Sequence, residues 1–209
     1  MSSPHLYLYG VIESADLRFE TDAVGGATEV RTVSHGPLSG VVSDIETTEP
    51  ERNDEDVEAH DEVLRELLTR DEELTVVPMR YGMAFKNART LKNLLRQARP
   101  VLTRSLREVE GSVELGLKVL DAEDGDLDPE AVRSAAERFD EVSEKYDDGD
   151  LFSDRLVLNR SYLVDRADTD AFDEAVESFR EEFGDDVIVQ YSGPWAPYSF
   201  VDVHIGVEQ

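Results

Sequence analysis

Short runs of β-branched, aliphatic and aromatic residues alternate with turn residues along the first part of the chain. Residues 6–12 (LYLYGVI) form one such run, and residues 28–34 and 38–44 flank the Gly36-Pro37 pair. Runs of this length and composition, bounded by glycine and proline, are typical of β-strands. We therefore predict a small sheet whose last two strands are joined by a tight connection.

Apolar residues then recur at helical spacing in two long segments. The first begins at Asn53 or Asp54 and extends to about residue 73, and the second covers residues 87–110. This spacing predicts two amphipathic helices, and the apolar run at residues 74–79 predicts a strand between them. Pro100 lies inside the second helix, where we expect a kink or a break because proline removes a backbone hydrogen bond.

The second half of the chain again interleaves strands and helices, after a helix stop at Gly111. An acidic, turn-rich connection at residues 121–129 follows its first strand. The whole pattern predicts an α+β protein of two domains, residues 1–110 and 111–209, with helices packed on mostly antiparallel sheets. In the second half, the predicted strands cover residues 112–120, 156–164, 187–191 and 200–205, and the predicted helices cover residues 130–146 and 169–183.

Acidic residues dominate the polar faces of these elements without displacing the apolar ones. The chain has 48 aspartates and glutamates against 21 lysines and arginines, and its formal net charge is −27, yet 40% of its residues are hydrophobic. A disordered acidic chain lacks such apolar content and periodicity, so we expect a folded protein. The acidity and the scarcity of lysine are typical of a salt-adapted cytoplasm, where salt screens the repulsion among carboxylates.

The side chains that most enzymes use are missing or scattered. Without cysteine the chain has no disulfide, thiolate nucleophile or cysteine-based metal site. None of the four histidines has the neighbours of a metal motif, and His60 falls on an apolar helical stripe, which favours a packed, hydrogen-bonded core histidine. We expect no catalytic, metal or cofactor site. No signal peptide or spanning run is visible, so we also expect a soluble, cytoplasmic protein that enters no membrane.

The sharpest contrast in charge is local. Residues 74–107 contain no aspartate or glutamate, and three explanations for their charge stay open. The cations pair with the acidic face of the helix at residues 54–73, or they form a docking surface for an acidic partner, or they bind nucleic acid. Base stacking would need aromatic side chains on the helix itself, and we expect no nucleic acid as partner. The cations are Arg80, Lys86, Arg89, Lys92, Arg96, Arg99, Arg104 and Arg107.

The single tryptophan lies between two prolines in residues 193–198 (GPWAPY). A segment stiffened by proline loses little conformational entropy on ordering, so Trp195 and Tyr198 are candidates to anchor a partner. The same composition is expected of a loop that closes the end of a sheet, and this packing role is the favoured interpretation.

Five segments together resemble the gas vesicle protein F/L family, and the length and acidity are most similar to an F member from a halophilic archaeon. The resemblance implies a non-enzymatic accessory protein of gas vesicle assembly that binds the hydrophobic major shell subunit and other accessory proteins, in a chaperone-like or nucleating role. The segments are LYLYGVI from Leu6, LSGVVSD from Leu38, VVPMRYGMAF from Val76, NRSYLVD from Asn159 and GPWAPYSFVDVHI from Gly193.

The resemblance also implies two α+β domains, of which the C-terminal one is ferredoxin-like. The element order predicted above for that half, β-α-β-α-β-β, differs from the ferredoxin-like order β-α-β-β-α-β. We expect partner contacts in the basic helix, in the segment before it and in the tryptophan loop. The competing hypotheses are a nucleic-acid-binding regulator and an enzyme with an unrecognised active site. The candidate partner-binding residues are Arg80, Tyr81, Phe85, Arg89, Arg96, Arg99, Trp195 and Tyr198.

Overall fold

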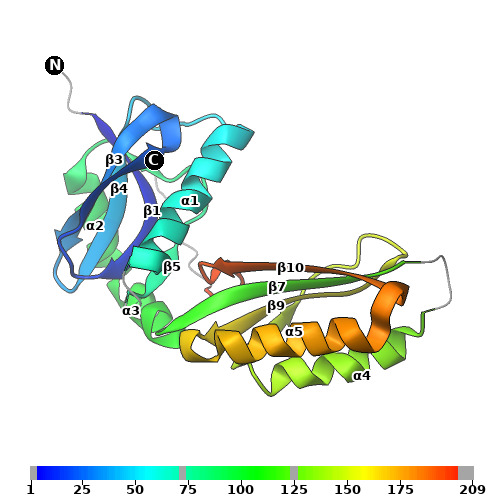
Figure 1. Cartoon of the computed structure of the whole chain (residues 1–209). Helices are drawn as coiled ribbons and strands as arrows, with labels where there is room; N and C mark the ends of the chain where they lie inside the picture. The colour runs from blue at the N-terminus through cyan, green and yellow to red at the C-terminus, as the bar shows by residue number, and fades with distance from the viewer. Residues whose placement is uncertain (1–3, 71–73, 123–126, 202–209) are drawn as a thin grey trace. The chain divides into compact units, whose positions relative to one another are not determined.

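The computed structural model describes residues 4–70, 74–122 and 127–201, and contacts divide the chain into two compact units (Figure 1). The first unit comprises the residues up to Glu110 together with Val201, and the second comprises Gly111–Phe200. Val201 belongs to the first unit because it packs against the apolar core of that unit.

The first unit is built on an antiparallel sheet with the strand order β2-β3-β4-β1-β5, and β6 also pairs with β1. β1 is buried from Leu6 to Ile12 because that run carries only apolar and aromatic side chains and one glycine. Its neighbours on both sides therefore come from distant parts of the sequence. The strands are β1 (His5–Glu13), β2 (Arg18–Ala23), β3 (Ala27–His35), β4 (Leu38–Ile45), β5 (Val76–Pro78) and β6 (Ala84–Phe85).

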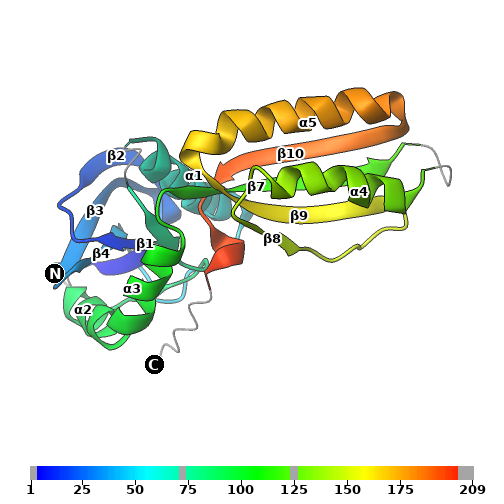
Figure 2. The same cartoon turned by 90° about the horizontal axis from the view of Figure 1, so that it is seen from below.

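Helices cover both faces of this sheet. α1 (Asp54–Arg70) packs on one face and the pair α2 (Ala88–Gln97) and α3 (Arg99–Glu108) packs on the other, as Figures 1 and 2 show. Two glycines of the sheet lie where a helix packs closely against it. A Cβ atom added at Gly10 would lie 3.2 Å from Leu64 of α1, and one added at Gly40 would lie 3.3 Å from Leu91 of α2.

The predicted break at Pro100 is confirmed. Residue 98 leaves the helical conformation, and Pro100 falls in the first turn of α3, where a missing N–H is tolerated. α2 begins where predicted because the Asn87 side chain accepts a hydrogen bond from the Thr90 N–H and caps the helix. α2 and α3 are therefore two separate helices whose apolar stripes both face the sheet.

The second unit has the element order β-α-β-β-α-β and the strand order β10-β7-β9-β8, with all neighbours antiparallel. This is the ferredoxin-like arrangement, and both helices lie on the same face of the sheet (Figure 1). The elements are β7 (Ser112–Asp121), α4 (Pro129–Asp140), β8 (Lys145–Asp148), β9 (Leu156–Asp165), α5 (Thr169–Phe183) and β10 (Val187–Trp195), and short 3₁₀ turns occupy Val24–Gly26, Arg166–Asp168, Gly184–Asp186 and Tyr198–Phe200.

The predicted element order of this half was wrong in two places. The helix expected at residues 130–146 ends at Asp140, and Lys145–Asp148 form the edge strand β8. All four β8 residues are exposed, so no apolar alternation announces the strand. The strand expected at residues 200–205 is not seen at Phe200, which ends a 3₁₀ turn, or at Val201, and residues 202–205 lie outside the described part.

Aromatic side chains fill the core between the helices and the sheet of the second unit. Phe139 of α4 lies 5.7 Å from Tyr162 of β9 and 5.2 Å from Phe172 of α5, measured between ring centroids. Rings that meet at such distances in tilted arrangements add to the stability from burial.

In the described ranges of both units, no helix combines the length and apolar character needed to cross a bilayer.

Candidate functional site

Six cations lie on the exposed sides of α2 and α3 and form the basic face. The helix positions between them carry Leu91, Leu94, Leu95, Leu102 and Leu106, which are buried against the sheet. Because a helix turns about 100° per residue, this spacing directs the charged side chains to solvent. All six members of the basic face are exposed: Arg89, Lys92, Arg96, Arg99, Arg104 and Arg107.

Internal pairing does not neutralise the basic face. Within the described residues, Arg104 is the only one of these cations in an ion pair, with Glu108 on its own helix at 2.8 Å. Both arginines of α1 pair with glutamates on α1, and the sheet separates α1 from the basic face. The interpretation that the acidic helix neutralises the basic one is therefore wrong for the described part of the chain.

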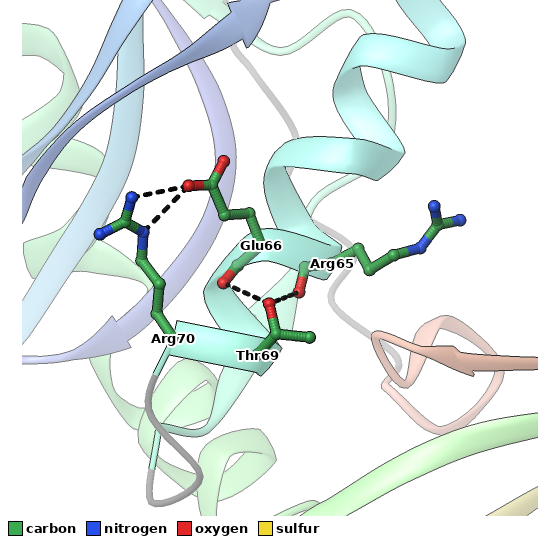
Figure 3. Close-up of polar contacts among 4 residues, drawn as sticks. All are labelled: Arg65, Glu66, Thr69 and Arg70. Atoms are coloured by element: carbon green, nitrogen blue, oxygen red, sulfur yellow. Dashed lines mark hydrogen bonds and ion pairs between the residues drawn. The ribbon is translucent and has the colours of Figure 1, made fainter.

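The last turns of α1 illustrate this local pairing (Figure 3). The Arg70 guanidinium donates through Nε and one Nη to a single Glu66 oxygen, at 3.0 and 2.7 Å. The Thr69 hydroxyl donates back to the carbonyl oxygens of Arg65 and Glu66. α1 carries five carboxylates besides Glu62 and Glu66, which pair with Arg65 and Arg70, so its exposed side stays acidic while the opposite side of the unit is basic.

One open hollow lies on α3 within the basic face. Arg99, Arg104 and Arg107 line it together with Pro100, Thr103 and Glu108. Planar guanidinium groups on successive helical turns can each hold a carboxylate through two parallel hydrogen bonds. The geometry suits an extended acidic surface better than a single small anion, because the groups follow the helix instead of surrounding one point.

Three predicted site residues lie before the basic helix in different environments. Arg80 is exposed, but Tyr81 is half-buried and its hydroxyl donates to the Glu51 carbonyl at 2.9 Å. Phe85 is only 3% exposed and belongs to the apolar core under α2. Its side chain is therefore corrected from a partner contact to a core residue. No aromatic ring of this segment lies free on the basic face for base stacking.

A buried polar network lies beneath the Arg80-Tyr81-Gly82 turn. Nε2 of His60 lies 3.1 Å from the Met79 carbonyl, which only accepts, so this nitrogen carries the hydrogen. Nδ1 then accepts from the Tyr7 hydroxyl at 2.9 Å, and that hydroxyl in turn accepts from the Gly82 N–H at 3.0 Å. His60 is 2% exposed, which confirms the expected core histidine.

Burial dominates the electrostatics of this network. It lowers the pKa of His60 and raises the pKa of Tyr7, because the charged form of each is poorly solvated in the core. It also raises the pKa of Tyr9 to about 12, although hydrogen bonds from Ser43 and Val24 favour the phenolate. All three groups are held in their neutral forms, which suits a structural role.

The tryptophan loop closes one end of the second unit's sheet. Trp195 is half-buried and donates from Nε1 to the Ser192 hydroxyl at 3.3 Å, and Ala196 is buried. Ser199 donates from its N–H and its hydroxyl to the buried Glu114 carboxylate, at 2.9 and 2.7 Å. These contacts favour the packing interpretation for Trp195, while Tyr198 remains 37% exposed.

The described ranges contain no group of three histidines or carboxylates close enough to hold a metal ion. The basic face includes the candidate partner-binding residues Arg89, Arg96 and Arg99, and Lys92, Arg104 and Arg107 lie on it with them.

The chain is similar in sequence and in fold to known proteins. The chain is 52% identical over 208 residues to gas vesicle protein F of Haloferax mediterranei, which covers 99% of this chain and 98% of that protein. It is 51% identical over 206 residues to gas vesicle protein F1 of Halobacterium salinarum, covering 98% and 96%. The fold matches the crystal structure of GvpF from Anabaena sp. with a TM-score of 0.84 at 17% identity, over 96% of this chain and 97% of that one.

The sequence model described as gas vesicle synthesis protein GvpL/GvpF matches residues 5–131 and 126–202, which together include both units. A match of this extent, with relatives above 50% identity over nearly the full length, identifies the family. The chain belongs to the gas vesicle synthesis protein GvpL/GvpF family.

Proposed function

We propose that the chain is an accessory protein of gas vesicle assembly that binds the hydrophobic major shell subunit in a chaperone-like or nucleating role and contacts other accessory proteins. It acts in the cytoplasm and at the growing gas vesicle. Membership in the GvpL/GvpF family and the relatives named gas vesicle protein F support the gas vesicle context. No observation in the described residues favours catalysis or nucleic acid binding over this role.

The docking site is inferred from the charge of the basic face, which ion pairs within the described residues leave largely uncompensated. Its cations are exposed, and among the described residues only Arg104 has an ion-pair partner, in a chain of net charge −27. Cations clustered on two adjacent helices attract and orient the carboxylates of an approaching partner. Arginine predominates in the cluster, and its planar fork holds a carboxylate more specifically than lysine does.

The acidic remainder of the surface serves the same role. A shell subunit that associates through apolar surface stays in solution only while that surface is covered. A binder rich in carboxylates covers it while presenting a strongly hydrated exterior, which opposes aggregation. We infer that the complex is handed to the growing wall without a cofactor.

The test reverses the charge of three arginines on the basic face. The variant Arg89→Glu, Arg96→Glu, Arg99→Glu should abolish gas vesicles in cells and reduce capture of accessory partners in a pull-down in concentrated salt. Its unfolding midpoint should stay close to that of the wild type, because exposed side chains without ion-pair partners contribute at most about 0.5 kcal/mol each.

A matched control separates the location of the charges from their number. Reversing Arg18, Arg133 and Arg180 changes the net charge equally, and these arginines lie outside the basic face. Arg18 and Arg133 are exposed and Arg180 is half-buried. Arg18 and Arg180 each form one ion pair, with Glu29 and Glu177, so the unfolding midpoint of the control is measured as well. The control should form vesicles. Normal vesicles in the basic-face variant, or equal loss in both variants, would reject the basic face as the docking site.

A further inference from the structure

Few large apolar side chains are exposed in the described residues, and the three most exposed belong to the second unit. Phe152 is 72% exposed, Leu151 is 53% exposed and Ile188 is 46% exposed. A protein whose other surface is dominated by carboxylates gains no stability from holding such side chains in water. An exposed apolar cluster of this kind marks a binding surface.

The strand register places Ile188 on the face of the sheet away from the helices. Tyr191 of β10 stacks on Phe172 of α5 at 5.9 Å between centroids, so its side chain points to the helix face. Side chains alternate along a strand, and Ile188 therefore points to the opposite face. Its partner in register is Leu120 of β7, which is half-buried on that same face.

The segment after β8 brings Phe152 to this helix-free face. Asn159 of β9 fixes the segment, since its side-chain amide donates to the Asp150 carbonyl at 2.9 Å and its own carbonyl accepts from the Gly149 N–H at 2.8 Å. Nζ of Lys118 lies 5.5 Å from the Phe152 ring centre. Lys118 precedes Leu120 by two residues on β7, so both lie on one face. Together Leu120, Leu151, Phe152 and Ile188 form the apolar patch.

Carboxylates border the apolar patch on the β8 side. Asp147, Asp150 and Asp154 are exposed, and no ion pair joins them to another described residue. The nearby cations are engaged: Arg155 donates to the Asp121 and Ala122 carbonyls, and Lys118 lies over the Phe152 ring. The patch is thus apolar, with the Lys118 ammonium over its Phe152 ring, and acidic on one border.

We propose that the apolar patch binds an amphipathic segment of the shell subunit. Apolar side chains of that segment cover Phe152, Leu151 and Ile188, and lysines or arginines flanking them meet the acidic border. The proposal rests on the proposed function and assigns the apolar contact to the second unit. At 1 M salt the Debye length is about 3 Å, so exposed charges farther apart than this are largely screened from each other. An apolar contact keeps its strength under these conditions.

The probe for this chemistry is a pair of labelled synthetic helical peptides with one leucine face, flanked by lysines in one peptide and by glutamates in the other. Fluorescence anisotropy measures binding to the full-length protein at the lowest KCl concentration that keeps it folded, where charges are screened least, and again in concentrated KCl. The lysine-flanked peptide should bind, and the variant Leu151→Ser, Phe152→Ser should bind it at least about tenfold more weakly, as expected when central anchors are removed. Phe152→Leu keeps an apolar side chain and should retain most of the affinity.

Four results would overturn the proposal. The first two are failure of the wild type to bind the lysine-flanked peptide and equal binding of that peptide by the serine variant. The third is equal binding of the glutamate-flanked peptide at the lowest KCl concentration that keeps the protein folded. The fourth is a wild-type dimer that is lost in the serine variant, since a second copy would then cover the patch. Circular dichroism confirms that the variants are folded, which the high exposure of both side chains favours.

Capture of the co-expressed shell subunit separates this proposal from the proposed function. Loss of capture in the serine variant, with retention in Phe152→Leu, supports both. If the wild type binds the peptide but not the shell subunit, the proposed function fails and the apolar patch stands. If the wild type and the serine variant capture the subunit equally, the function stands and the patch is rejected.

Discussion

Acidification should destabilise the first unit through His60. Both ring nitrogens of the neutral side chain are hydrogen-bonded in the core, one to the Met79 carbonyl and one to the Tyr7 hydroxyl. A proton added to Nδ1 would face the hydroxyl that now donates to it. Burial accordingly lowers the pKa of folded His60 below the ordinary value of about 6.5.

The sign and size of the effect follow from proton linkage. Below about pH 6.5 His60 is protonated in the unfolded chain but stays neutral in the folded chain. The unfolded state then binds more protons, so the free energy of unfolding decreases as the pH falls. The loss approaches about 1.4 kcal/mol per pH unit and continues until the pH reaches the lowered folded pKa. Total stabilities of about 5–15 kcal/mol make this loss measurable.

The assay compares denaturant unfolding of the wild type and of His60→Gln at several pH values between about 7.5 and 5 in concentrated KCl. The carboxylates titrate in both proteins, so the difference between the two pH slopes isolates His60. The wild type should lose stability more steeply than the variant below pH 6.5, although the variant is less stable at neutral pH. Parallel slopes would refute the assignment of His60 as a neutral, doubly bonded core residue.

Three further predictions concern the whole chain and the second unit. The unfolding midpoint should be lower in dilute buffer than in concentrated KCl because the carboxylates repel one another over a longer range, and an equal or higher midpoint in dilute buffer would contradict this. Gly193→Ala should lower the free energy of unfolding by about 1–3 kcal/mol, since Gly193 has φ +120° and the added Cβ would lie 2.8 Å from the Glu114 carbonyl oxygen. Gly26→Ala is the matched control and should lower it less, because Gly26 has φ +75° and the added Cβ would have no atom within 4 Å. Residues 1–110 and 111–209, expressed separately, should each unfold cooperatively, as circular dichroism during denaturant titration would show; a non-cooperative transition in either half would contradict the predicted domains.

Elements whose apolar pattern is set by burial could be predicted from the sequence. α5 has its predicted bounds, and β1, β3, β4 and β9 differ from theirs by at most one residue at each end, because one or both faces of each meet a core. β2 and β8 were missed for the opposite reason. β2 buries only Phe19 and Ala23, and β8 buries nothing, so their pairing depends on backbone hydrogen bonds to neighbouring strands.

The basic face could be predicted because its residues are contiguous and because their helix periodicity is visible in the sequence. The buried position of Phe85 could not, since the chain reverses at the Arg80-Tyr81-Gly82 turn and returns to pair with β1, where Phe85 meets Leu6. The apolar patch gave no local signal either. Leu120, Phe152 and Ile188 are far apart in sequence, and only the register of β7 and β10 and the hydrogen bonds of Asn159 bring them to one face.

The two surfaces differ in how salt acts on them, and this difference can assign partners to each. Contacts through the basic face are ionic and lie at the surface, so added salt weakens them unless guanidinium and carboxylate groups pair closely. Contacts through the apolar patch depend on removing Phe152 and Leu151 from water, which salt screening leaves intact. A partner held through the patch should therefore remain bound to the Arg89→Glu, Arg96→Glu, Arg99→Glu variant at every salt concentration that keeps the protein folded. A partner held through the basic face should be lost from that variant and retained by the Leu151→Ser, Phe152→Ser variant. The two contacts use different side chains, so each can be removed by mutation without removing the other.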